Sequence, residues 1–339
     1  MQALLRIDLR AIAANWHMLR ERHAGGAVAA VLKADAYGLG VAPVARALRD
    51  AGCRHFFVAH PAEGIALRAA LAEDGPMVAV LNGFMPGAAP PDIWPVVNTP
   101  AMARAHAGRG PVLLHVDTGM ARLGLDPAEC DALPGLDLRY VMSHLACADE
   151  PGHPMNALQR QRFAAVAARF PGVPTSLANS SGVFLGPGFG SALARPGAAL
   201  FGINPQPGQP NPMRPVLRLD APILQLRAVA AGTPVGYGAA WSAARPSVIA
   251  VVAAGYADGY CRALSGRGIG ILAGQPVPVV GRVSMDLTEF DVTGVPAALG
   301  DMLTLMGPDN PPDLLAEQAG TIGYEMLTAL GSRYRRIYA

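Results

Sequence analysis

Short apolar runs alternate with segments of helical periodicity over residues 4–200, and few folds accommodate that order. Strands that alternate with helices form a parallel sheet, because each crossover must return the chain to the same edge. Eight such strands predict an α/β fold, a (β/α)8 barrel of the TIM type. The expected strands are 28–32, 55–60, 77–81, 93–98, 111–116, 138–144, 174–179 and 193–200. The expected helices are 11–23, 41–51, 62–73, 100–107, 127–133 and 155–170.

The pattern changes at residues 205–212, where Pro, Gly, Gln and Asn are typical of a linker. Beyond it, short strand-like runs separated by Gly and Pro predict a mostly β domain. We therefore expect a barrel over residues 10–215 and a β domain over 216–339. The basic tail at 333–336 is expected to be a solvated charged end. The expected strands of this domain are 223–230, 247–254, 270–272, 277–280, 288–291 and 302–306.

Composition excludes several classes of partner. The formal net charge of +2 over 339 residues favours neither nucleic acid nor an acidic membrane surface. The first ten residues are too charged for a signal peptide, and uncharged stretches such as 173–194 are interrupted by Gly, Pro, Ser and Asn. The four cysteines have neither paired nor metal-type spacing, which predicts no metal site and a reduced, cytoplasmic compartment.

Lys33 is the only lysine of the chain, and it follows the first predicted barrel strand. An ammonium at the end of a buried strand costs several kcal/mol to desolvate unless it is paired or neutral. The simpler interpretation is a lysine that emerges into solvent. An amine that acts as a nucleophile and forms a Schiff base is the chemical alternative.

Polar groups follow several other predicted strands. Groups at the carboxyl ends of barrel strands converge on one face, which carries catalysis. Each has an ordinary alternative, since Arg122 could cap a helix, His144 could be a satisfied core histidine, and residues 179–180 could form a turn. Their gathering at one mouth of the barrel favours a catalytic site. The groups are Lys33, Tyr37, Arg122, Ser143, His144, Asn179, Ser180 and Arg195.

Seven motifs in this order resemble those of the alanine racemase family. They are KADAYGLG at 33–40, VDTGMARLG at 116–124, ANS at 178–180, RPG at 195–197, GYG at 236–238, GYADGY at 255–260 and GRVSMD at 281–286. The resemblance covers both predicted domains. It implies a barrel that binds pyridoxal phosphate and a β domain that the N-terminal strand 1–9 joins. It also implies interconversion of L- and D-alanine in the cytoplasm, supplying D-alanine for peptidoglycan.

The resemblance also implies two bases. Lys33 holds pyridoxal phosphate as a Schiff base and serves as one base, and Tyr237 serves as the other. Racemisation needs both, because the proton is removed from one face of Cα and returned to the opposite face. A phenol is a poor base at neutral pH, so His144 and Arg195 are expected to lower its pKa as cationic neighbours or hydrogen-bond donors. A buried hairpin tyrosine is the alternative for Tyr237.

Of the roles that the resemblance implies, that of Arg195 best separates a racemase from other enzymes that use this cofactor. It has no acceptor, so beside the pyridine nitrogen it donates a hydrogen bond and leaves that nitrogen unprotonated, which weakens the ring as an electron sink. Arg122 and the Met285 amide are implied to bind the substrate carboxylate. The other implied cofactor contacts are Tyr37, His144, Asn179, Ser180, Gly197 and Ala198, and the implied access route is lined by Tyr256, Arg282 and Asp286.

Because Tyr237 and Met285 lie in the β domain, the resemblance implies a head-to-tail homodimer with shared sites. The chain departs from the family at two positions. Many members carry a carbamylated lysine where this chain has His115, so a histidine, a bound anion or water must orient Arg122. Ser332 falls at about the place of a gate tyrosine, which leaves the strictness for alanine open.

Three other functions compete with alanine racemisation. A racemase of serine or of several amino acids would use the same scaffold, and the sequence does not separate it. A fold-related amino-acid decarboxylase is opposed by Arg195 and by Tyr237 in place of a cysteine-type acid. A barrel that carries pyridoxal phosphate without turnover is opposed by the second domain.

Overall fold

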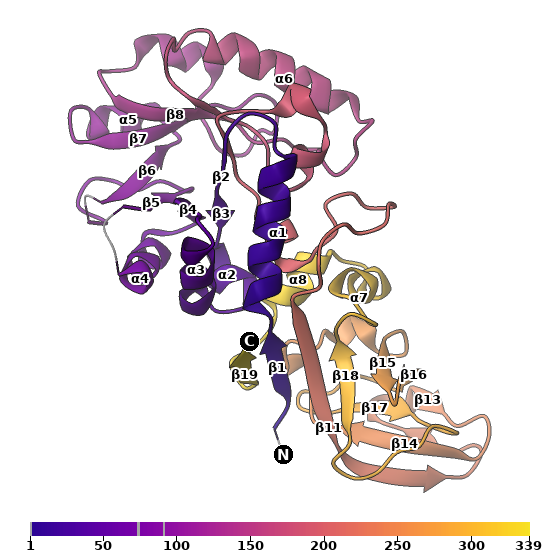
Figure 1. Cartoon of the computed structure of the whole chain (residues 1–339). Helices are drawn as coiled ribbons and strands as arrows, with labels where there is room; N and C mark the ends of the chain where they lie inside the picture. Colours follow the sequence, from indigo (N-terminus) through magenta and orange to yellow (C-terminus); the bar gives the residue numbers. More distant parts are fainter. Residues whose placement is uncertain (1, 73–74, 91) are drawn as a thin grey trace. The chain divides into compact units, whose positions relative to one another are not determined.

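The computed structural model describes residues 2–72, 75–90 and 92–339. The chain divides into two compact units (Figure 1), Ile12–Arg214 and a second made of Met1–Ala11 with Pro215–Ala339. The first contains the alternating strands and helices, and the second is mostly strands. The helix expected over 62–73 is α4 (Pro61–Leu71), and its expected end at residue 73 lies outside the described residues.

Seven parallel strands of the first unit form one sheet, in the order β3-β4-β5-β6-β7-β8-β9. The eighth position is filled by β10, which pairs in parallel with β2. Backbone hydrogen bonds join this pair to the sheet edges, from Ala29 to Ala194 and from Arg195 to Ala178, both 2.8 Å. The sheet is thereby closed, and the predicted TIM-type barrel is confirmed. The strands are β2 (Ala27–Val28), β3 (Ala30–Val31), β4 (His55–Val58), β5 (Met77–Val80), β6 (Ile93–Val97), β7 (Pro111–His115), β8 (Asp137–Met142), β9 (Thr175–Ser176) and β10 (Leu193–Ala194).

The barrel interior is filled by apolar side chains of mixed size, from alanine to phenylalanine. One buried cluster takes members from seven strands and from no helix, so it is the inner layer. A second cluster joins the outer faces of β6, β7 and β8 to Phe163 and Val166 of a covering helix. Strands that are covered on both faces are apolar throughout, which is why these runs could be recognised as strands. Full burial of one such large side chain contributes about 1.5–3 kcal/mol.

The barrel helices begin where the sequence supplies starting residues. Proline occupies the first turn of α4, α5 and α6, where its missing N–H costs nothing. The Thr99 hydroxyl accepts a hydrogen bond from Met102 N at 3.2 Å and caps α5. The short helix expected at 127–133 is a 3-10 turn, Pro127–Ala132. The helices are α1 (Leu9–Arg22), α3 (Val41–Asp50), α5 (Pro100–His106) and α6 (Pro154–Ala167).

The last two barrel strands are shorter than expected. The runs 174–179 and 193–200 contain only the two-residue strands β9 and β10, and the second continues as a 3-10 turn, Ala198–Phe201. After β10, the Ser180 hydroxyl accepts from the Gly197 and Ala199 amides at 3.0 and 3.2 Å. The side chain thus competes with the strand ladder for these backbone groups.

The second unit is built on one sheet in the order β14-β17-β16-β15-β18-β11-β1-β19. The long strand β11 pairs with β18 through its first half and with β14 through its second, with a register shift between Ile223 and Gln225. Because β14 also pairs with β11, the run of strands from β14 to β11 forms a closed ring. The strands are β1 (Leu4–Ile7), β11 (Leu217–Val229), β14 (Ser247–Val252), β15 (Ile269–Leu272), β16 (Gln275–Val280), β17 (Thr288–Asp291), β18 (Met302–Met306) and β19 (Arg335–Tyr338).

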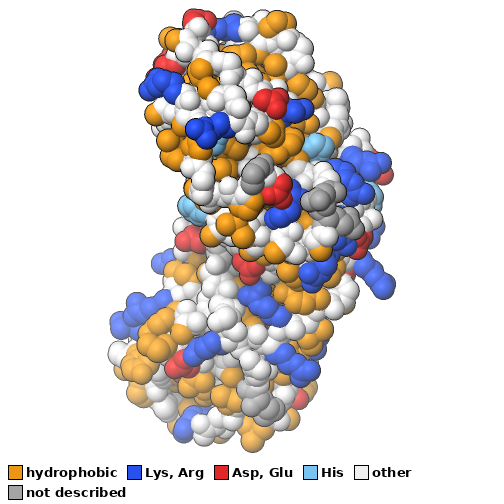
Figure 2. All heavy atoms as spheres, turned by 90° about the vertical axis from the view of Figure 1, so that its left-hand side faces the viewer, with side chains coloured by type: hydrophobic (Ala, Val, Ile, Leu, Met, Phe, Trp, Pro, Cys, Tyr) orange, Lys and Arg blue, Asp and Glu red, His pale blue; other side chains and the backbone are white. Residues whose placement is uncertain are grey.

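A hairpin and two helices complete this unit. The hairpin is formed by β12 (Pro234–Val235) and β13 (Trp241–Ser242), which the sequence pattern did not predict. The helices are α7 (Pro312–Ala319) and α8 (Gly323–Thr328). Within the described part of the chain, no helix is both long enough and apolar enough to cross a membrane. On the face drawn in Figure 2, basic side chains are scattered among acidic and hydrophobic ones.

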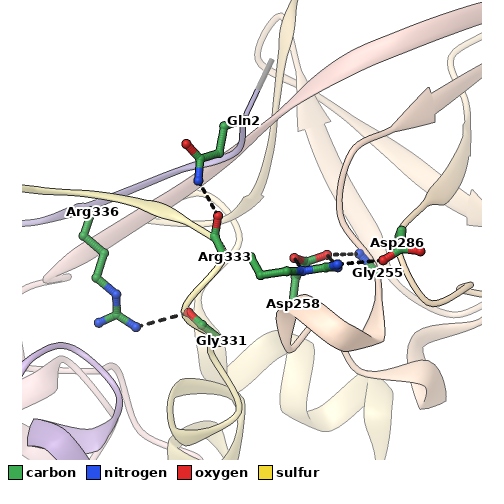
Figure 3. A network of polar contacts seen from close by, with 7 residues as sticks. All are labelled: Gln2, Gly255, Asp258, Asp286, Gly331, Arg333 and Arg336. Carbon is green, nitrogen blue, oxygen red and sulfur yellow. Dashed lines mark hydrogen bonds and ion pairs between the residues drawn. The ribbon is translucent and has the colours of Figure 1, made fainter.

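The basic tail is not the free charged end expected from the sequence, although Arg333 and Arg335 are exposed to solvent. Residues Arg335–Tyr338 form β19, which pairs in parallel with β1. The Arg333 guanidinium donates to both carboxylate oxygens of Asp258, at 2.7 and 2.8 Å, and to Asp286 at 2.8 Å (Figure 3). Asp258 is buried and also accepts from Gly255 N, so the tail arginine neutralises a carboxylate that would otherwise be buried alone.

Candidate active site

The lysine strand ends in an unusual turn, α2 (Lys33–Tyr37). Four consecutive residues, Ala34 to Tyr37, adopt the left-handed conformation with φ of 54°. An L-residue there costs about 1–2 kcal/mol relative to the right-handed region. Four in a row therefore need support from elsewhere. The sequence did not predict this turn, because none of the four is glycine or asparagine.

Two carboxylates support the left-handed turn. The Asp35 carboxylate accepts from Val41 N at 2.7 Å, at the start of α3. One oxygen of Glu63 accepts from Ala34 N at 2.6 Å, and the other accepts from the backbone at the start of α4. Glu63 thus ties the lysine turn to a neighbouring helix. Sequence reasoning missed Glu63, although a glutamate three residues after a helix start is a recognisable capping signal.

The environment of Lys33 favours a reactive amine. Burial and the positive charge of Arg122 lower the pKa of Lys33, and Glu63 opposes them by raising it. A lowered pKa increases the fraction of neutral amine at neutral pH, which is the nucleophilic form. The side chain of Lys33 is half-buried, which disfavours the interpretation of a lysine simply exposed to solvent.

Arg195, which follows β10, is a buried cation of the same barrel. Its guanidinium donates to the Ser143 carbonyl at 2.6 Å and to the Ser176 hydroxyl. Burial lowers its pKa to about 9, so it remains charged at neutral pH. No described carboxylate forms an ion pair with it. A guanidinium has five N–H donors, so Arg195 can donate further to an acceptor on this face.

His144 is neutral, which corrects one expectation. Part of its surface is exposed, but its dense surroundings, together with the charges of Arg195 and Arg122, hold its pKa well below the usual range. His144 therefore cannot act as a cationic neighbour that lowers the pKa of a tyrosine. A neutral imidazole instead presents a flat ring that can pack against another ring.

Hydroxyl and backbone N–H groups gather after β9 and β10. The Ser180 hydroxyl bonds to the amides of Gly197 and Ala199, and a Cβ added at Gly197 would lie 2.3 Å from the Tyr37 hydroxyl. Only glycine permits this close approach. Asn179 lies alongside and accepts from Gly182 N at 2.8 Å. Barrel enzymes often bind phosphate at this place, after the seventh and eighth strands.

Arg122 lies on a loop that Asp117 shapes. The Asp117 carboxylate accepts from the amides of Gly119, Met120 and Ala121 at 2.8–2.9 Å. The Arg122 side chain is exposed, and its charge influences the pKa of Lys33 and of His144, so all three belong to one cluster.

Gln159 of α6 is a supporting residue that sequence reasoning missed. It is fully buried and bonds to the His144 carbonyl at 2.9 Å and to Ala146 N at 2.8 Å. A glutamine on the buried face of a helix is the signal that would have found it.

The predicted site residues of the second unit lie on its loops. Tyr237 lies in the hairpin between β12 and β13 and is 72% exposed, so the alternative of a hairpin tyrosine is right about the hairpin and wrong about its burial. Arg282 lies beside it, 3.2 Å from the position of a Cβ at Gly238. The carbonyl of Met285 accepts from Ala257 N at 3.0 Å.

Tyr256 and Asp286 lie close to these residues in the same unit. The backbone N–H of Tyr256 donates to the Ser284 carbonyl at 3.0 Å, and Arg333 holds the carboxylate of Asp286. The access-route residues predicted from the sequence therefore share one part of this unit.

The described residues of the first unit place a nucleophilic lysine, a buried unpaired arginine and a group of hydroxyl and amide donors on the carboxyl face of a barrel. These features are typical of a barrel enzyme whose lysine can react with an aldehyde and whose donors can bind an anion. Residues 7–205 match the family described as alanine racemase, N-terminal domain, and residues 216–338 match alanine racemase, C-terminal domain. The chain belongs to the alanine racemase family.

Individual proteins agree over the full length. An alanine racemase of Acidiphilium cryptum is 54% identical, with 98% of each chain covered. A catabolic alanine racemase of Mesorhizobium japonicum is 47% identical, over 99% of this chain and 93% of that one. A crystal structure of alanine racemase from Bartonella henselae with covalently bound pyridoxal phosphate has a TM-score of 0.92 and 38% identity, with all of both chains covered. The predicted family, enzyme class and cofactor are thereby confirmed.

Proposed function

We propose that this chain racemises alanine with Lys33 and Tyr237 as bases on opposite faces of the cofactor, and that the second unit supplies Tyr237. The observation that carries the proposal is Lys33 itself. It is the only lysine, it stands at the end of a barrel strand, and burial beside Arg122 lowers its pKa.

The residues of the barrel face fit pyridoxal phosphate. Ser180, Tyr37 and the amides at Gly197 and Ala198 would hold the phosphate, where a side chain on Gly197 would leave no room. Arg195 has N–H donors in excess of its two protein acceptors and would donate to the ring nitrogen.

Two further residues would flank the cofactor ring. His144, a neutral imidazole, would pack on it, and Asn179 would lie at its edge. When bound, the cofactor withdraws electrons from the substrate Cα and so acidifies its proton.

The protein's own groups then move that proton. Lys33 would hold the cofactor, and its neutral amine would accept or return the proton at Cα of the substrate. Tyr237 exchanges the proton on the opposite face. Arg122 and the Met285 amide would hold the carboxylate of the substrate so that Cα stays between the two bases.

Tyr256, Arg282 and Asp286 would line the access route. Arg333 holds Asp286 in place there. Ser332 is exposed and stands at about the place where some relatives have a gate tyrosine. Because this difference leaves the strictness for alanine open, rates with serine should be measured beside those with alanine.

We propose a head-to-tail homodimer in which each site combines the barrel of one chain with the second unit of its partner. The support is the exposure of large side chains on that unit, since Tyr237, Tyr256 and Met285 are 72%, 42% and 54% exposed. Apolar surface of this kind is often covered by a partner. Mixing inactive Lys33→Ala with inactive Tyr237→Phe should then restore activity, because one site of each mixed dimer keeps both bases. An inactive mixture whose mixed dimers have formed would contradict the shared site.

The two-base assignment is tested by deuterium exchange. Tyr237→Phe should keep the bound cofactor but lose α-proton exchange from one enantiomer of alanine only. The loss of a positioned general base typically costs about 10²–10⁴ in rate, which is well above assay noise. Equal loss for both enantiomers would contradict the assignment.

We further propose that the product D-alanine serves peptidoglycan synthesis in the cytoplasm. The support is that the Acidiphilium cryptum relative carries the unqualified name, although a relative named catabolic is also similar. Expression of the chain in a bacterium that requires D-alanine should remove the requirement. Continued dependence on D-alanine, with the protein shown to be active in extracts, would contradict this role.

A further inference from the structure

The amino-terminal mouth of the barrel holds an open cavity of about 460 Å³. Lys33 follows the carboxyl end of β3, so in a parallel barrel the cavity lies at the opposite end from the candidate active site. Its walls come from four strands, with His55 of β4, Met77 of β5, Trp94 of β6 and Tyr140 of β8. Met77, Trp94 and Tyr140 belong to or pack against the inner layer of the barrel, so the cavity continues the barrel interior. Its volume is in the range of small-molecule sites.

The walls of the cavity are flat and uncharged. The rings of His55 and Tyr140 meet edge to face with their centroids 6.2 Å apart, and the Tyr140 hydroxyl lies 3.3 Å from His55 Nε2. Burial lowers the pKa of His55 and raises the pKa of Tyr140, so both side chains are neutral at neutral pH. With Trp94 they form three aromatic walls, which favour a flat ring as the occupant.

A β-bulge places an arginine at the rim of this cavity. Val112 of β7 pairs with Leu138 of β8, but the next residue, Leu113, pairs with Tyr140. Arg139 is therefore the extra residue of the bulge. Bulges at the rims of barrels change the direction in which a side chain points. Here the Arg139 side chain lines the cavity.

The guanidinium of Arg139 is aimed at an aromatic wall and is only weakly engaged. Its central carbon lies 6.0 Å from the centroid of the Trp94 ring. A flat ring in contact on both faces needs about 7 Å, so a small outward movement of this exposed side chain admits one. Arg139 also pairs with Asp137 at 3.0 Å, but their side chains are 51% and 45% exposed, and such solvated pairs are weak.

A second guanidinium gives the cavity a positive rim. Arg54 immediately precedes β4, and its Nη1 donates to the carbonyls of Arg49 and Cys53 at 2.8 and 3.1 Å. Its other N–H groups remain for a further acceptor. Among the described residues that line the cavity, none is a carboxylate. The rim is therefore suited to an anion.

We propose that the amino-terminal mouth of the barrel binds a small anion that carries a flat ring, with the ring against Trp94 and Tyr140 and the anionic group on Arg54 and Arg139. Guanidinium groups match the oxygens of carboxylates and phosphates, and rings stack on aromatic and guanidinium planes. Aromatic carboxylates and nucleoside monophosphates share this chemistry. The site does not depend on racemisation, because it lies at the other end of the barrel from Lys33.

The first test titrates the holoenzyme by calorimetry with benzoate and with AMP, which each combine a ring with an anionic group. Adenosine supplies a ring without the charge, and inorganic phosphate supplies the charge without a ring. We expect benzoate or AMP to bind with a Kd of about 0.1 mM, at least about tenfold more tightly than adenosine and phosphate. Binding of only one of the two identifies the anionic group as a carboxylate or a phosphate. If neither binds, or if adenosine or phosphate binds as tightly, the proposal is overturned.

The second test locates the bound probe through a charge-matched pair of variants. Arg139→Gln should weaken binding at least about tenfold, without changing the Tm or the absorbance of the bound cofactor. Arg227→Gln removes an equal charge from an exposed position of β11 in the second unit and should leave the Kd unchanged. Equal weakening in the two variants would show general charge attraction and overturn the proposal.

The third test changes the rim and the wall in opposite directions. Asp137→Asn frees Arg139 from its ion pair and should tighten binding about threefold. Trp94→Leu removes a flat wall and should lower the affinity for the ring-bearing probe to about that for inorganic phosphate. Weaker binding in Asp137→Asn, or an unchanged affinity in a folded Trp94→Leu, would overturn the proposal.

Discussion

Replacing Ala34 by glycine should stabilise the barrel, although the same change in a regular helix is destabilising. Ala34 has φ of 54° and an exposed side chain, so the substitution removes strain and loses no packing. The left-handed conformation costs an L-residue about 1–2 kcal/mol. Glycine removes this cost. It also lowers the free energy of unfolding by about 0.5–1 kcal/mol, because it gives the unfolded chain more conformational freedom. The difference predicts a gain of about 0.5–1 kcal/mol in the free energy of unfolding.

The matched control is Ala66→Gly, at an exposed position inside α4. There the backbone is an ordinary right-handed helix, and glycine should lower the free energy of unfolding by about 1 kcal/mol. Urea unfolding can be followed through Trp16, whose indole N–H donates to the Val28 carbonyl of the lysine strand at 3.0 Å. The two variants should move the midpoint in opposite directions. A midpoint that falls in both would refute the argument that the turn is strained.

The same variant has a second expected effect. The Glu63 bond to the backbone of residue 34 remains, but glycine lets the turn that carries Lys33 relax. We therefore expect kcat for alanine to fall while stability rises, since strained backbone at a site holds the reacting group in place.

Gly197→Ala should weaken retention of pyridoxal phosphate roughly tenfold, because the new Cβ would overlap the Tyr37 hydroxyl, and a titration followed by cofactor absorbance measures it. An unchanged affinity would show that the phosphate does not bind at this position. Arg195→Glu should slow racemisation roughly 100-fold and release pyruvate as a side product, because a carboxylate keeps the ring nitrogen of the cofactor protonated. A product mixture without pyruvate would contradict the role of Arg195. Arg333→Leu should lower the Tm and raise the KM for alanine, because Asp258 and Asp286 lose their shared partner. Thermal unfolding and initial rates check both effects, and an unchanged Tm would show that this pairing contributes nothing.

The barrel could be predicted from the sequence because its strands are buried on both faces. Uninterrupted apolar runs such as Met77–Val80 are the direct result of that burial. The candidate site residues of the barrel could be expected on one face for a related reason, since parallel strands bring their carboxyl ends together, and their roles stay predictions. Arg122 lowers the pKa of Lys33, and Arg195, Arg122 and Lys33 all lower the pKa of His144.

Other features follow from interactions that no local pattern contains. The left-handed turn could not be predicted from Ala34, Asp35 and their neighbours alone, because part of its support comes from Glu63 on another element. The neutrality of His144 is the sum of burial and of charges from other strands. The strand β19 contains Arg335 and Arg336 and resembles a solvated tail until its partner β1, at the other end of the chain, is known.

The attachment of the cofactor to Lys33 is tested most directly by borohydride reduction of the holoenzyme, followed by proteolysis and mass spectrometry. Because Lys33 is the only lysine, the chain offers no other lysine to compete for the label. We expect one stable adduct per chain, on the peptide that contains Lys33, and none in Lys33→Ala. An adduct on any other residue, or a wild-type enzyme that racemises alanine but yields no adduct on Lys33, would contradict the account.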